Sequence, residues 1–264
     1  MTSSAVYNTP APVIAVILFA GIILCYLAGI RLLRYRKKKN PEYEAGGMGA
    51  LEGGLLGLLS LLLAFTFNKA ASNYDTRRAM LVQEANDIGT ALYRSDLYPD
   101  SIRSEFRNDF KEYIAARIAY YEAGNDENKI RASLDNAENI SLRIWKRAAG
   151  NNLPGETTRS MQMIPAINSM MDAMNHREAA RVEVVPESIL WLLFVLCLAG
   201  SFIIGYSSKS KKADWVIVGA YALMTVMTIY LILDLDRPGR GIITTRLAHQ
   251  YMDHLPDSFD PGSK

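Results

Sequence analysis

The chain has 264 residues, of which 50% are hydrophobic and 21% are charged, and its formal net charge is only +2. So weak a charge gives no basis for nucleic-acid binding, and the sequence contains no HExxH, CxxC or P-loop motif. Its two cysteines, Cys25 and Cys197, lie inside apolar runs, where a free thiol packs as a small hydrophobic group. We therefore expect no catalytic residue, metal ion or cofactor, and we expect the hydrophobic blocks to be membrane spans in contact with a lipid bilayer.

An apolar run of 18 residues extends from Val13 to Ile30, which is long enough to cross a bilayer. Six basic residues follow within the nine positions from Arg31 to Lys39. A cleaved signal peptide would carry positive charge before its apolar run rather than after it, so we predict a first transmembrane helix over residues 13–34.

The second span is predicted over residues 49–67, and no proline interrupts the chain between Pro41 and Pro99. Because a helix interior tolerates glycine far better than proline, one helix is expected to leave the bilayer and continue to about Tyr98. One face of this helix is small or polar, with members three or four residues apart, as the helical period requires. This small-residue stripe consists of Gly53, Gly57, Ser60, Ala64, Asn68, Ala71, Asp75 and Arg78.

Residues 68–186 have helical periodicity and no convincing strand pattern, so they predict a soluble helical bundle. After Pro99, Ser101 is expected to cap a helix that ends near Gly124. Two further helices are predicted over residues 126–149 and 157–184, with Pro165 as a kink site in the second.

Two more spans are predicted over residues 187–206 and 215–234, where Pro186 and Glu187 suit a helix N-terminus and Trp215 suits the membrane interface. The predicted fold is therefore all-α: four transmembrane helices with an inserted soluble bundle, into which the second span continues. The predicted segments are 1–67, with the first two spans; 68–186, the bundle; 187–234, with the last two spans; and 235–264, a tail with a loose polar end.

The two short loops, 31–48 and 207–214, are basic, whereas the N-terminal tail has no Lys or Arg. Short basic loops stay in the cytoplasm. We therefore expect both loops to be cytoplasmic, and both termini and the bundle to lie on the other side.

Three groups of charged residues lie near the predicted spans. Glu52 is one turn inside the second span, and its place near the helix end favours the membrane interface over the hydrocarbon. Asp75 and Arg78 are spaced to pair on one helix face. Asp234, Asp236 and Arg237 end the fourth span, where a salt bridge onto the bundle is favoured over a cation site.

The small-residue stripe has two interpretations, which do not exclude each other. Glycine, serine and alanine allow close packing of transmembrane helices, so the stripe is a candidate packing face. Alternatively, it lines water in an oligomer, with Ser60 in a narrow constriction and Asn68, Asp75 and Arg78 in polar rings beyond it.

Three stretches of the sequence resemble a family of bacterial membrane proteins that have a bestrophin-like domain. The first runs from Gly57 to Phe67, the second includes Tyr74, Asp75, Arg77 and Arg78, and the third runs from Glu84 to Ala91. The run from Asp234 to Pro238, with Gly241, resembles the family's closing motif, and the similarity covers residues 13 to 255. The polar residues that the resemblance singles out are Glu52, Arg77, Glu84, Asn86, Asp234, Asp236 and Arg237.

Bestrophins are pentameric anion channels with four spans per subunit and a pore lined by the second span. The resemblance thus implies a homo-oligomer, with five subunits by analogy, that conducts inorganic ions across a bacterial inner membrane. The alternative is a non-conducting, membrane-anchored sensor or scaffold whose 68–186 bundle binds a partner.

Overall fold

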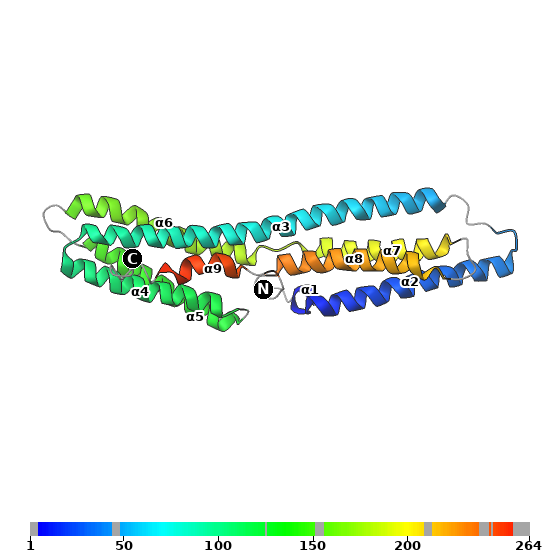
Figure 1. The fold of residues 1–264 in the computed structure, drawn as a ribbon, viewed down its shortest axis with the longest axis horizontal. Coiled ribbons are helices and arrows are strands. Elements are labelled where there is room, and N and C mark those ends of the chain that lie inside the picture. Colours follow the sequence, from blue (N-terminus) through cyan, green and yellow to red (C-terminus); the bar gives the residue numbers. More distant parts are fainter. Residues whose placement is uncertain are drawn as a thin grey trace. The chain divides into compact units, whose positions relative to one another are not determined.

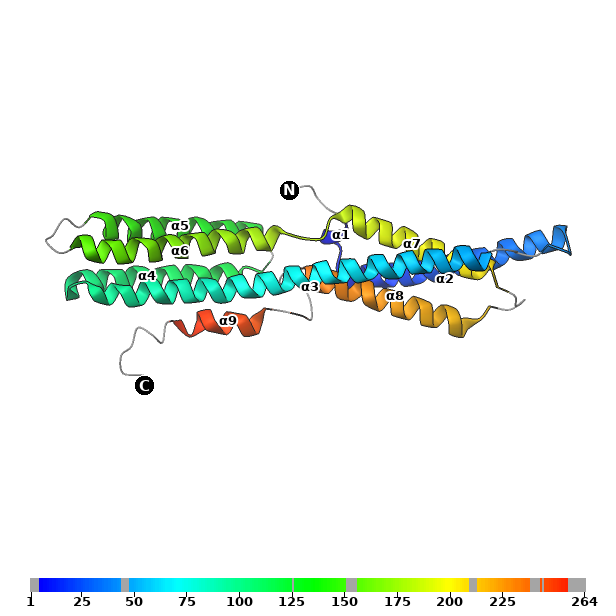
Figure 2. The ribbon, with the colours of Figure 1, turned by 90° about the horizontal axis from the view of Figure 1, so that it is seen from above.

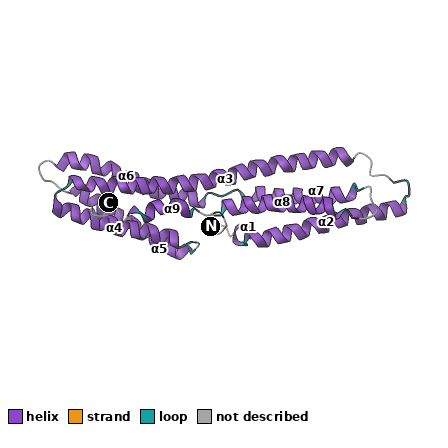
Figure 3. Cartoon of the chain, in the orientation of Figure 1, coloured by secondary structure: helices purple, strands orange, loops and turns teal. Residues whose placement is uncertain are grey.

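A computed structural model describes residues 5–43, 48–124, 126–150, 156–208, 213–237, 243 and 245–255. These residues form helices and no strand, which confirms the predicted all-α fold (Figure 3). Four helices are long and apolar enough to cross a membrane. They are α2 (Ala11–Lys39), α3 (Met48–Arg94), α7 (Glu187–Tyr206) and α8 (Trp215–Asp236), as labelled in Figure 1. The chain is therefore a multi-pass membrane protein.

The chain divides into two compact units. The membrane unit consists of Met1–Ser72 and Val184–Arg237, and the bundle unit consists of Asn73–Glu183 and Pro238–Lys264. The single helix α3, 47 residues long, contributes its first part to the membrane unit and its second part to the bundle unit. The sequence had placed the first boundary at residue 67 and the C-terminal tail in a segment of its own.

Inside the membrane unit, α2 and α7 touch at glycines. A Cβ atom added at Gly29 would lie 2.2 Å from the Phe202 carbonyl oxygen, and one added at Gly205 would lie 2.2 Å from the Tyr26 carbonyl oxygen. The Ser201 hydroxyl donates a hydrogen bond to the Ile22 carbonyl at 2.6 Å. This is close helix packing by small residues, and the sequence had suggested it for α3 instead.

The two basic loops leave the membrane unit at the same end. Tyr43, which follows α2, shares a 2.5 Å hydrogen bond with Tyr206 at the end of α7. At the next residue, the Ser207 hydroxyl donates to the Glu52 carboxylate at 2.7 Å. Short hydrogen bonds therefore connect the beginning of α3 and the segment after α2 to the end of α7.

The bundle unit consists of the second part of α3, η1 (Ser95–Leu97), α4 (Asp100–Glu122), α5 (Glu127–Gly150), α6 (Glu156–Val182) and α9 (Arg246–Asp253). Its core is closely packed around side chains such as Ile88, Phe106, Phe110, Ile144 and Ile167, each with 0% exposure. Figure 2 shows α5 beside α6 and α9 beside α4. The short helix α1 (Ala5–Asn8) precedes α2 in the membrane unit.

Most predicted helices differ from the observed ones only at their ends, but one prediction was wrong. Ser101 does not cap α4, because the cap position is Pro99 and Ser101 lies in the first turn. The C-terminal tail also contains a helix that was not predicted, because residues 246–253 form α9, whose Met252 is fully buried in the bundle core. The last nine residues, 256–264, lie outside the described residues.

Candidate functional site

The small-residue stripe is exposed along α3. Its members Gly53, Gly57, Ser60, Ala64, Asn68, Asp75 and Arg78 are all exposed, and Ala71 is half-buried. A Cβ atom added at Gly53 or at Gly57 would meet no atom of the described residues within 4 Å. Within the described part of a single chain, these glycines therefore do not serve as contacts between helices.

A different face of α3 packs on the rest of the membrane unit. Leu59, Thr66 and Ala70 are 3%, 4% and 0% exposed. At 100° per residue, this row lies roughly 140° around the helix axis from the stripe. On the remaining side of the helix is an exposed apolar row that includes Leu58, Leu61 and Phe65, with exposures of 48%, 53% and 64%. The membrane part of α3 thus has a packed face, a lipid-compatible face and the stripe.

The membrane part of α3 is also the least buried of the four spans. Only 11% of the residues in its most apolar window are buried, compared with 33% to 44% in the other three. Its apolar row is suited to lipid, whereas exposed glycine, serine and asparagine gain little from hydrocarbon contact.

Beyond the apolar stretch, the polar residues of α3 have different environments. Asp75 and Arg78 are exposed, and within the part of the chain that the structure describes no hydrogen bond or ion pair joins them, contrary to the predicted pairing. Arg78 instead lines an open pocket of about 240 Å³ with Gln250, Tyr251 and other residues of the C-terminal segment. Asn86 is exposed.

Arg77 and Glu84, in contrast, point into the bundle. Arg77 is 7% exposed and donates a hydrogen bond to the Glu183 carbonyl at 3.2 Å. Glu84 is fully buried and accepts hydrogen bonds from Arg117 of α4, through Nε, and from Arg177 of α6, through Nη1 at 2.5 Å. We call Glu84, Arg117 and Arg177 the Glu84 cluster.

The Glu84 cluster remains ionised despite its burial. Burial alone raises the pKa of the Glu84 carboxyl, but the guanidinium groups of Arg117 and Arg177 outweigh it and hold that pKa below its usual range. The Tyr120 ring lies against both cations, with its centroid 4.5 Å from Cζ of Arg117 and 5.0 Å from Cζ of Arg177. Removing the carboxylate would leave two cations in an apolar core.

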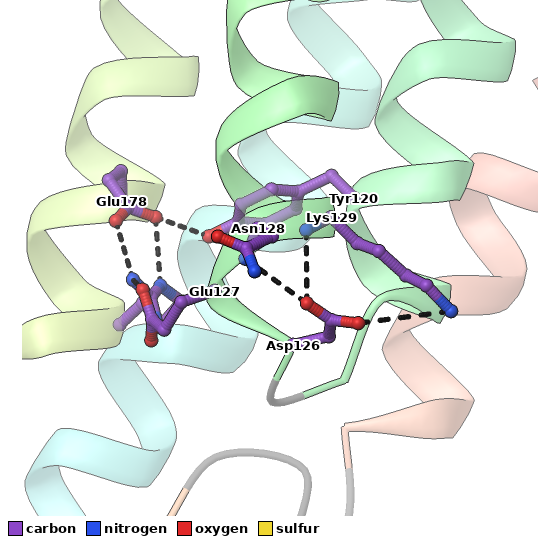
Figure 4. Close-up of polar contacts among 7 residues, drawn as sticks. Tyr120, Asp126, Glu127, Asn128, Lys129 and Glu178 are labelled. Carbon is purple, nitrogen blue, oxygen red and sulfur yellow. Dashed lines mark hydrogen bonds and ion pairs between the residues drawn. The ribbon is translucent and has the colours of Figure 1, made fainter.

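A second acidic group, Glu178, bonds the Tyr120 side chain that lies against this cluster, and Figure 4 shows the contact between Glu178 and Tyr120. The Tyr120 hydroxyl donates to Glu178 at 2.6 Å, and Glu178 also accepts hydrogen bonds at 2.9 and 2.8 Å from Arg181. The same figure shows Asp126 accepting from the backbone N–H groups of Asn128 and Lys129, which caps α5.

The two arginines of the cluster can be recognised in the sequence by their positions on apolar helix faces. Arg117 occurs at core spacing among Phe110, Tyr113 and Ile114, and Arg177 follows Met174 on the buried face of α6. A charged residue on an otherwise apolar helix face indicates a buried partner, but it does not say which one.

The closing residues of α8 bind the start of the chain within the membrane unit. Asp236 accepts hydrogen bonds from the Tyr7 hydroxyl at 2.5 Å and from the Val185 N–H at 2.7 Å. Arg237 donates to the carbonyls of Thr9 and Val6 at 2.6 and 2.7 Å. Asp234 is buried at 3% exposure. Among the described residues, no group of three or more His, Cys, Asp or Glu side chains could hold a metal ion. Gly241 of this motif lies outside those residues.

The comparison with protein families decides the membership. The model of the bestrophin-like domain matches residues 54–248, well over half of the chain. The chain belongs to the bestrophin-like domain family. The match includes α3 from residue 54 onward, the Glu84 cluster and the closing residues of this bestrophin-like protein. Among curated proteins and among solved structures, none matches it.

Proposed function

We propose that copies of this bestrophin-like protein associate around α3 and enclose an ion-conducting pore lined by the small-residue stripe. The observation that carries the proposal is the exposure of Gly53, Gly57 and Ser60 on a candidate membrane span, away from the face that packs within the chain. A polar face of this kind is accommodated in a membrane when it meets other protein or water.

The order of residues along the stripe supports a narrow pore with polar rings at one end. Gly53, Gly57, Ser60 and Ala64 lie in the apolar part of α3 and form the constriction. Asn68, Asp75 and Arg78 follow it and form successive rings around the pore axis. Because these rings carry both signs of charge, we assign no ion selectivity. By analogy with bestrophins, we propose five subunits.

We further propose that the protein lies in a bacterial inner membrane with both basic loops in the cytoplasm. The hydrogen bonds Tyr43–Tyr206 and Ser207–Glu52 support a shared side for the two loops, because they hold both loop entrances at one end of the membrane unit, and the basic charge of the loops favours the cytoplasm. We also propose that Glu52, which accepts the Ser207 hydrogen bond at that end, lies at the membrane interface rather than in the hydrocarbon. The bundle then lies on the opposite side of the membrane.

Cysteine accessibility tests whether the stripe faces water. In a variant with Cys25→Ala and Cys197→Ala, a single cysteine replaces Asn68, and the protein is reconstituted into liposomes. A charged, membrane-impermeant thiol reagent is expected to react with the new cysteine and to reduce ion flux through the Asn68→Cys protein. The matched control is Leu61→Cys, on the exposed apolar row, where lipid should prevent the reaction.

The mass of the oligomer tests whether copies of the chain associate. Association is required because a single α3 helix cannot enclose a pore. Light scattering in mild detergent should give a multiple of the 29.4 kDa chain. A monomer with no flux would instead favour the anchored sensor or scaffold.

A further inference from the structure

Two neighbouring side chains in the bundle core carry polar atoms that have no hydrogen-bond partner among the described residues. Arg117 is 0% exposed, and although its Nε binds Glu84, neither Nη1 nor Nη2 has a hydrogen-bond partner among the described residues. One turn earlier on α4, the hydroxyl of Tyr113 is also buried and without a hydrogen-bond partner in the same part of the chain. Buried polar groups in folded proteins nearly always have a partner, so these three atoms indicate a missing one.

The missing partner must accept hydrogen bonds. A guanidinium group has only donors, and a tyrosine hydroxyl has one donor to offer. The two oxygens of Glu84 are already engaged, Oε1 by Arg117 and Oε2 by Arg177. The three atoms without partners therefore present donors on one face of α4, where Tyr113 and Arg117 are four residues apart.

The charge of the site distinguishes an anion from a water molecule. The Glu84 cluster contains two guanidinium groups and one carboxylate, which leaves one surplus positive charge in a buried position. Outside this buried group, Glu178 is bonded to the Tyr120 hydroxyl and to Arg181, and Arg181 also pairs with the exposed Glu127. Water would satisfy the donors but not the charge, whereas an anion satisfies both.

We propose that the bundle binds a small inorganic anion of about the size of chloride between the Nη groups of Arg117 and the hydroxyl of Tyr113. We choose a small ion because Arg117 and Tyr113 are each 0% exposed, so that a ligand between them would be enclosed by protein. This site lies in the bundle and is separate from the proposed pore, so it stands whether or not the protein conducts ions.

The test is the thermal stability of the purified full-length protein in detergent while chloride replaces gluconate at constant ionic strength. The wild-type midpoint of unfolding should rise with chloride and saturate. Tyr113→Phe removes one donor and adds no bulk, and it should raise the half-saturating chloride concentration about tenfold. Bromide should act like chloride.

The matched control is Tyr98→Phe, which removes another buried hydroxyl of the same core. The Tyr98 ring packs on Phe106, which lies two turns before Tyr113 on α4. It should leave the half-saturating concentration unchanged. A midpoint that does not respond to chloride, or one that responds equally in Tyr113→Phe, would overturn the proposal and assign water to the site.

Discussion

Glu84 and Arg177 lie on α3 and α6, and they meet in the bundle core through a 2.5 Å hydrogen bond between Oε2 and Nη1. With Arg117 on the other oxygen, one carboxylate holds α3, α4 and α6 together. The helix that carries the stripe is therefore fixed in the bundle by an ion pair as well as by apolar packing.

Glu84→Gln should destabilise the bundle severely, because it keeps the shape of the side chain but leaves two buried cations without a counter-charge. We expect a loss of about 3–5 kcal/mol in the free energy of unfolding, measured by circular dichroism of the purified protein during denaturation. Asn86→Ala, two residues on and exposed, should change it by less than about 0.5 kcal/mol. Equal effects of the two substitutions would contradict the role given to Glu84.

The same carboxylate should make stability depend on acid pH. The pKa of Glu84 in the folded protein is depressed, chiefly because Arg117 and Arg177 outweigh burial. Its contribution is thus fully present above the unfolded pKa, about 4.3, and is lost as the pH falls through the lower folded pKa. The gap in unfolding free energy between wild type and Glu84→Gln should narrow below about pH 4. A gap that stays constant down to pH 2 would show that the carboxylate is not ionised in the folded protein.

Substitution by alanine should destabilise the protein at Gly205 but not at Gly53. Gly205→Ala places a methyl group against the Tyr26 backbone and should separate α2 from α7, which lowers the thermal midpoint of the protein. Gly53→Ala meets no atom within 4 Å and should leave the folded chain intact. Unfolding in detergent distinguishes the two variants, and a Gly53→Ala protein as unstable as Gly205→Ala would mean that the stripe packs within the chain.

The attachment of α9 to the bundle should weaken in mild acid. His249 is 4% exposed and stacks on Tyr121 at 3.7 Å between ring centroids. Burial lowers the pKa of His249, and the positive charge of Arg177 lowers it further. The carboxylates of Asp253, at 3.3 Å, and of Glu122 and Glu84 raise the pKa, but burial outweighs them. Undocked α9 therefore binds more protons, so docking loses free energy as the pH falls below about 6.5.

Hydrogen exchange of α9 measures this effect. After correction for intrinsic rates, protection should fall between pH 7.5 and 5.5 in the wild type but not in His249→Phe, which keeps a stacking ring without a titrating group. His254→Phe, at the exposed end of α9, should retain the wild-type dependence. Protection that is independent of pH in all three proteins would exclude His249 as the cause.

Helical periodicity and long apolar runs were sufficient to predict the four spans and most of the bundle, because both depend on local sequence. The partners of Glu84 and the contact between α2 and α7 could not be derived in this way. They depend on which distant residues meet, and Gly29 and Gly205 look no different in sequence from Gly53 and Gly57. The short helix α9 was missed because only its packing on the bundle, through Met252 and His249, stabilises so few residues.

The stripe itself could be read from its spacing, but its surroundings could not. The sequence favoured helix packing over water for the stripe that includes Ser60, and the exposure of the stripe argues against packing only within a single chain. Under the proposed function, other copies of the protein cover the stripe.

The most direct measurement is ion flux through the purified protein in liposomes, under separate chloride and potassium gradients, for the wild type, Ser60→Phe and Leu61→Phe. Both substitutions add an aromatic ring at an exposed position of α3, but only Ser60 belongs to the stripe. We expect flux in the wild type and in Leu61→Phe and none in Ser60→Phe. No flux in the wild type, or equal flux in all three, would contradict a pore lined by α3.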